Sequence, residues 1–189
     1  MAGALNQLGT LAAQQADYAR SRRMYEGALS ISEKLGDKAG KATALHQLGI
    51  LARREVHDSQ ARLFGEESLA IFRETGDKSG IAAAQHELGL LAQRSGDFKE
   101  ARRLYEESLL VERELGGRPD EAIHLAQLAL LDEQEGRFRE GVEHSRQAEE
   151  IMVRLGNKAD VERISAQRGR LEEKAAKESR HSSSRAKLR

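Results

Sequence analysis

Several residue types are scarce in this sequence, and each scarcity narrows the fold and the chemistry. The chain has no cysteine, which excludes disulfide bonds, thiolate metal sites and cysteine nucleophiles. It has one proline and 4% aromatic residues, while Ala, Leu, Glu, Gln and Arg are frequent. Because straight side chains lose little rotamer freedom in a helix, this composition favours an all-α protein.

The sequence also lacks a net charge and long apolar runs. Lys and Arg number 31 and so do Asp and Glu, so the net charge gives no general attraction to nucleic acid or to an anionic membrane. No apolar stretch reaches the roughly 18 residues that a spanning helix needs, and the N-terminus lacks a secretory signal pattern. We therefore expect a soluble, cytoplasmic protein without a membrane segment.

Basic residues gather at the C-terminal end of the chain. From Lys174 onward, six Lys or Arg residues stand against one Glu. Residues 175–189 have little to bury, so we expect a basic, disordered tail. Because this tail has no aromatic residue and few net charges, we do not expect it to bind nucleic acid.

The dominant feature of the sequence is a repeat with a period of 40 residues. A Leu-Gly pair recurs in the first three copies and a closing glycine in all four; these are Leu8-Gly9, Leu48-Gly49, Leu88-Gly89, Gly36, Gly76, Gly116 and Gly156. Tandem copies at a fixed spacing predict an array in which neighbouring units bury a shared core.

Each copy predicts two helices. The closing glycines suit the left-handed residue that ends a helix, and Asp37, Asp77 and Asn157 can cap the helices that follow. The predicted helices lie near residues 3–15, 18–35, 38–55, 58–75, 78–95, 98–115, 118–135, 138–155 and 158–174. In the last of these, Arg168 replaces the leucine of the earlier copies, as is typical of a polar capping helix.

Two columns of small residues recur in the second helix of each copy. They are Ser21, Ala61, Ala101 and Gly141, and then Ala28, Ser68, Ser108 and Ala148. A large side chain at these positions would hold paired helices apart, so we expect both columns to be buried.

The third copy carries the motifs most clearly, with Leu88-Gly89, Gly96-Asp97-Phe98, Ala101-Arg102, Tyr105 and Ser108. This pattern resembles the tetratricopeptide repeat, and its 40-residue period is similar to the repeats of kinesin light chains and G-protein-signalling modulators. The resemblance covers residues 1 to about 172. It implies an α-solenoid, a right-handed superhelix of four units at about residues 1–37, 38–77, 78–117 and 118–157, closed by the capping helix 158–174.

Two copies depart from this pattern. Gly65 and Ser145 stand where the other copies have tyrosine, and Asp132 replaces an alanine. The second and fourth copies are therefore looser matches than the third.

The resemblance also implies that the first helices line a concave groove that holds peptides. Carried over by position, the groove residues are Asn6, Thr43, His46, Ile50, Arg53, Arg54, His86, Leu90, Gln93, Arg94, Ile123, Leu130 and Gln134. The Lys, Asn and Arg clamp with which some members grip a terminal carboxylate is absent, so no specific ligand is implied.

The arginines at positions 53, 54 and 94 have two interpretations. They are either solvated helix ends or, with Ile50 and Leu90, part of a basic and apolar groove for an acidic-hydrophobic peptide. His46 and His86 share a column, but stacked repeats hold such residues on the order of 10 Å apart, too far for one zinc ion. No nucleophile, base or phosphate loop is arranged for catalysis, so we expect no metal, no cofactor and no enzyme activity.

The sequence therefore predicts a non-enzymatic protein-interaction scaffold that binds a partner's peptide in its groove. The alternative is a regulatory or self-association segment of a larger signalling or transcription protein. In that case the contacts would form through the N-terminal face of the first helix, which has no capping side chain before it.

Overall fold

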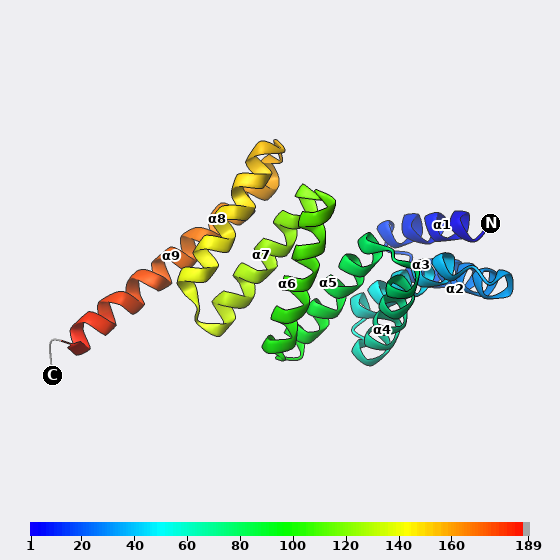
Figure 1. Cartoon of the computed structure of the whole chain (residues 1–189), viewed down its shortest axis with the longest axis horizontal. Helices are drawn as coiled ribbons and strands as arrows, with labels where there is room; N and C mark the ends of the chain where they lie inside the picture. Colours follow the sequence, from blue (N-terminus) through cyan, green and yellow to red (C-terminus); the bar gives the residue numbers. More distant parts are fainter. Residues whose placement is uncertain (187–189) are drawn as a thin grey trace. The chain divides into compact units, whose positions relative to one another are not determined.

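The computed structural model describes residues 1–186, with side chains as far as Arg180, and all regular structure in this part is α-helical. The helices are α1 (Ala2–Gln14), α2 (Tyr18–Leu35), α3 (Lys38–Arg54), α4 (Asp58–Thr75), α5 (Lys78–Arg94), α6 (Phe98–Leu115), α7 (Arg118–Glu135), α8 (Phe138–Arg154) and α9 (Lys158–Ala186) (Figure 1). The all-α class and the predicted helices are confirmed. Within the described range, none of these helices is long and apolar enough to cross a membrane.

Single residues set most helix ends. Asp37 and Asp77 each accept a hydrogen bond from the backbone N–H three residues on, at 2.9 Å. Asn157 caps α9 in the same way at 3.2 Å. Gly36 and Gly76 end α2 and α4 in the left-handed conformation. These residues satisfy or accommodate the backbone groups left free at helix ends, which is why the sequence placed the boundaries well.

The helix α9 differs from its prediction in length. It continues to Ala186, whereas the sequence predicted an end at Lys174 and a disordered tail over 175–189. The added turns begin with Ala, Ala, Lys and Glu, which are good helix formers. Arg139 also donates a hydrogen bond to Ser179 Oγ at 3.0 Å. The predicted start of the tail is therefore wrong, and its last three residues lie outside the described part of the chain.

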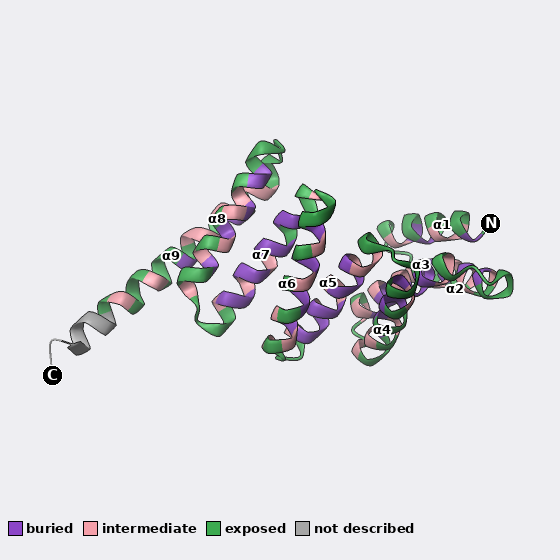
Figure 2. Cartoon of the chain, viewed as in Figure 1, coloured by how far each residue is buried: buried purple, intermediate pink, exposed green. Residues whose placement is uncertain are grey.

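The helices fall into two compact units, Met1–Val111 and Glu112–Arg189, divided within α6. In the first unit, α1 packs against α2 and α3, and α3 and α4 both pack against α5. In the second unit, α8 packs against α7 and α9. Figure 2 shows buried residues running along the helices in stripes, beside exposed stripes on the opposite side.

The small columns lie in the core of the helix pairs. Ser21, Ala61 and Ala101 are at most 2% exposed, and Ala28 and Ser68 are fully buried. Small side chains at these positions let paired helices approach closely. The predicted burial of both columns is confirmed at these positions.

The outward face of α9 is polar. Ile164 and Leu171 are fully buried on its inner side. Arg168 lies on the same inner side, at the position of the buried leucines of α3 and α5, and its Nε is 2.9 Å from Oε2 of Glu149 on α8. The exposed residues of α9 include Glu162, Arg163, Arg170 and Glu173, so its outward face is polar, and its role as a capping helix stays a prediction.

Candidate peptide-binding groove

Two adjoining hollows lie between α1 and α3 in the first unit. One, of about 170 Å³, is lined by Thr10, Ala13, Gln14, Tyr25, Gln47, Ile50, Leu51 and Arg54. The other, of about 380 Å³, is lined by Asn6, Gln7, Thr10, Leu11, Gln14, Thr43 and Gln47. Because Thr10, Gln14 and Gln47 border both hollows, we treat them as one site, the α1–α3 groove.

Tyr25 of α2 fixes the polar wall of the α1–α3 groove. Its buried ring lies against Gly9 of α1, where a Cβ atom would come within 2.5 Å of Cε1. Its hydroxyl donates a hydrogen bond to Gln47 Oε1 at 3.3 Å and lies 3.1 Å from Thr10 Oγ1. The hydroxyl and amide groups of this wall are therefore oriented by protein contacts before any ligand arrives.

Arg54 lines the smaller hollow beside Ile50 and is solvent-exposed. In the part of the chain that the structure describes, its guanidinium group has no ion pair or hydrogen bond. An arginine presents five N–H donors in a planar fork that suits a carboxylate. The α1–α3 groove thus offers one available cation next to an apolar side chain.

The other two predicted groove arginines are engaged in internal pairs. Arg53 Nε lies 2.6 Å from Glu87 Oε2 and a terminal nitrogen 3.3 Å from Glu87 Oε1, in a two-point contact between α3 and α5. Arg94 pairs with Asp58 and donates to the Arg53 carbonyl at 3.2 Å. These arginines connect neighbouring helices, so they are not simply solvated helix ends, and a ligand would have to compete with their acidic partners.

His46 and His86 are half-buried, each beside an aromatic ring. The ring centroids lie 6.2 Å apart for His46 and Phe72, and 5.7 Å apart for His86 and Tyr105. Burial lowers the pKa of His46, and burial with the nearby charge of Arg53 lowers the pKa of His86 to about 4. Both rings are therefore neutral near pH 7. Nowhere in the described chain do three His, Cys, Asp or Glu side chains gather as a metal site would require.

The remaining predicted groove residues lie on three helices. Leu90 and Gln93 are half-buried on α5, where Gln93 accepts a hydrogen bond from the Tyr105 hydroxyl at 2.8 Å. Ile123, Leu130 and Gln134 lie on α7 in the second unit, and of these only Leu130 is half-buried. Their part in binding stays a prediction.

The sequence analysis treated the tyrosine only as part of the repeat pattern and missed that the Tyr25 hydroxyl forms part of the groove wall. The available signal was the Tyr25 and Gly9 combination, which recurs as Tyr105 and Gly89. A tyrosine whose ring fills the space above a helix glycine must direct its hydroxyl along that helix, toward the side chains that border the groove.

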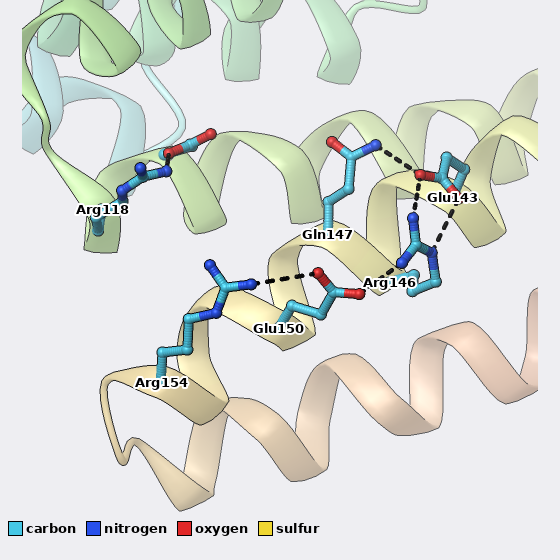
Figure 3. A network of polar contacts seen from close by, with 7 residues as sticks. Arg118, Glu143, Arg146, Gln147, Glu150 and Arg154 are labelled. Atoms are coloured by element: carbon cyan, nitrogen blue, oxygen red, sulfur yellow. Dashed lines mark hydrogen bonds and ion pairs between the residues drawn. The ribbon is translucent and has the colours of Figure 1, made fainter.

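Glu143 and Glu150 of α8 are exposed and lie beside an arginine. In α8, Arg146 pairs with both Glu143 and Glu150, and Gln147 donates to Glu143 at 2.8 Å (Figure 3). Hydrogen bonds from Arg146 and Gln147 lower the pKa of Glu143 to about 2. Exposed pairs of this kind contribute little to stability, and the Glu143 carboxylate stays ionised, so it has no acid–base role near neutral pH.

The repeated helix pairs, with small columns at their contacts and a polar groove between first helices, define an α-solenoid built from short helical repeats. The family model of the tetratricopeptide repeat matches residues 1–74 and 80–154, and the chain belongs to that family. No curated protein matches the sequence.

Several solved structures share the fold. BtubC (BKLC) from P. vanneervenii is 20% identical with a TM-score of 0.82, and the match covers 91% of this chain and 72% of that one. Kinesin light chain TPR-like repeats from Podosopora anserina are 18% identical with a TM-score of 0.67, over 91% of this chain and 95% of theirs. A signal transduction ATPase with a tetratricopeptide repeat sensor from Pyrococcus horikoshii is 17% identical with a TM-score of 0.77, over 88% of this chain and 26% of that one. At these identities the likeness shows the fold alone.

Proposed function

We propose that this protein is an interaction scaffold that binds a peptide segment of a partner in the α1–α3 groove, with an acidic side chain of that peptide on Arg54. Tetratricopeptide repeats generally mediate protein–protein interaction, which supports the class of function. The observation that carries the proposal is the available guanidinium group of Arg54 at the edge of a hollow that also contains Ile50.

The chemistry of the α1–α3 groove favours an acidic-hydrophobic segment. Ile50, Leu51 and Ala13 provide apolar contact, while Thr10 and Gln47 present polar atoms to the peptide backbone. Among the predicted basic residues, Arg53 and Arg94 already hold internal carboxylates. Selectivity for an acidic residue therefore depends on Arg54.

The test is selection from a displayed library of random 12-residue peptides, because no natural ligand needs to be known. We expect the bound peptides to be enriched in Asp or Glu next to apolar residues. Arg54→Glu should weaken binding of a selected peptide at least tenfold. Binding should also weaken from about 0.1 M to 1 M salt, since the Debye length falls from about 10 Å to about 3 Å.

Arg23→Glu is the matched control. Arg23 is an exposed arginine on α2 that does not line either hollow. If both charge reversals weaken binding equally, the effect is general electrostatics and the proposal fails. Selected peptides without acidic residues would refute the role of Arg54 as well.

A further inference from the structure

The outer face of α1 carries an apolar row that its counterparts in the other helices bury. Leu8 and Leu11 are 44% and 51% exposed. The equivalent leucines of α3, Leu48 and Leu51, are 1% and 2% exposed and pack in a cluster with Tyr25 of α2. The same column is therefore covered by a preceding helix in α3 and uncovered in α1.

Five exposed residues along α1 and at its two ends form a regular seam. Met1, Ala4, Leu8, Leu11 and Gln15 are all exposed and follow one another at spacings of three, four, three and four residues. This alternation is the heptad pattern with which one helix packs against another in a coiled coil. It indicates that a second helix packs on this face of α1.

The first 16 residues contain no Asp, Glu, Lys or Arg, although charged residues make up 33% of the chain. At that average, a stretch of this length would hold about five charged side chains. A helix without charged side chains has no like-charge repulsion against a copy of itself. An acidic or basic partner helix would find no side-chain charge to pair with.

We propose that two copies of this protein associate through an antiparallel contact of their α1 helices, centred on Leu8. A two-fold axis at Leu8 places it against its own copy, Ala4 against Leu11, and Met1 against Gln15. A small residue thus faces a large one on either side of the central leucine pair, which lets the helices interlock. The contact shares only Leu11 with the residues that line the peptide-binding groove.

A head-to-tail contact is disfavoured by the other end of the chain. The outward face of α9 carries Glu162, Arg163, Arg170 and Glu173, which are all exposed. Burying them under the leucines of α1 would remove charged groups from water without a better partner. The association is therefore a closed dimer, and since one helix makes a small interface, the dimer is weak.

The test begins with sedimentation equilibrium at chain concentrations from about 1 μM to 1 mM. The wild-type mass should rise from 20.9 kDa toward twice that value and stop there. Leu8→Glu should keep the monomer mass, with helicity unchanged because Leu8 is 44% exposed. Leu63→Glu is the matched control, since Leu63 of α4 is 62% exposed and lies outside the seam.

A monomer at all concentrations overturns the proposal, and so does a dimer that survives Leu8→Glu. Growth beyond a dimer overturns the closed arrangement. Because Leu11 also borders the groove, Leu8 is the diagnostic position. Arg54→Glu should leave the dimer intact, so that failure of the dimer and failure of the groove proposal are separable.

The chain has no cysteine, so single cysteine variants report the orientation cleanly. Under oxidation, Leu8→Cys should cross-link with itself. Ala4→Cys should not cross-link with itself, but should do so when mixed with Leu11→Cys. Self-cross-linking of Ala4→Cys would show a parallel pair and overturn the antiparallel contact.

Discussion

Residues 40 positions apart occupy equivalent places in the helix pairs α5–α6 and α7–α8. At several of these places the side chains differ in size and polarity. In α5–α6, the buried ring of Tyr105 lies where a Cβ on Gly89 would come within 2.6 Å of it. In α7–α8, the buried Ser145 replaces the tyrosine and Ala129 replaces the glycine. The glycine is needed at this position only where a ring must fit.

A second pair of positions differs more strongly. Ala92 and Leu104 are buried in α5–α6, whereas the equivalent residues of α7–α8 are Asp132 and His144. Asp132 is fully buried, and its Oδ2 lies 2.6 Å from His144 Nδ1. The same backbone accepts either an apolar contact or a polar pair, provided that both members change.

The largest predicted effect comes from breaking this polar pair. His144→Leu should lower the free energy of unfolding by about 3 kcal/mol, because Asp132 stays buried without its closest partner. The double variant Asp132→Ala with His144→Leu recreates the chemistry of α5–α6 and should be within about 1 kcal/mol of wild type or more stable. Urea unfolding measures both, and equal losses from the single and double variants would show that the two residues are not coupled.

The glycine position gives the next largest effect. Gly89→Ala should destabilise by about 2 kcal/mol, because its Cβ would overlap the ring of Tyr105. Gly49→Ala is the comparison, since its Cβ would meet no atom closer than 3.4 Å. That variant should be neutral or stabilising by up to about 1 kcal/mol, because alanine favours a helix. Similar melting behaviour of the two variants would contradict the proposed role of Tyr105.

The sequence predicted features that depend on neighbours along the chain. The caps Asp37 and Asp77 and the buried Ala101 follow from local spacing and the repeat period. The sequence did not predict the contact between Arg53 and Glu87, because that contact depends on the rotamers that two side chains 34 residues apart adopt. It noted Asp132 as a departure, but the partner His144 lies across a turn on another helix.

A smaller, pH-dependent effect separates α5–α6 from α7–α8, because Ala126 stands where α5 has His86. The pKa of His86 is lowered from its ordinary value to about 4, first by burial and then by Arg53 and His46. The unfolded chain therefore takes up a proton at higher pH than the folded one. The part of the free energy of unfolding that depends on a neutral His86 is fully present above about pH 6.5, and it is lost as the pH falls toward 4.

We expect this loss to reach about 1–2 kcal/mol, reduced from the full linkage value because the ring is only half-buried. Urea midpoints at pH 7, 5.5 and 4.5 measure it. His86→Ala, which copies Ala126, should remove this part of the pH dependence. A variant whose pH profile parallels that of wild type would show that His86 titrates alike in both states.

The smallest effect extends the comparison to the turn between the helices of each pair. Gly96 and Gly136 have positive φ angles of 81° and 74° at this turn, while Val56 at the equivalent place after α3 has a φ of 63°. A β-branched residue is strained there by roughly 1–2 kcal/mol, and glycine is not, although glycine loses more chain entropy on folding. Val56 is 70% exposed, so replacing its side chain removes little buried apolar surface.

Val56→Gly should therefore stabilise the protein by about 0.5–1 kcal/mol, and Gly96→Val should destabilise it by at least as much. A lower urea midpoint for Val56→Gly would mean that the valine side chain supplies a contact that outweighs the backbone strain.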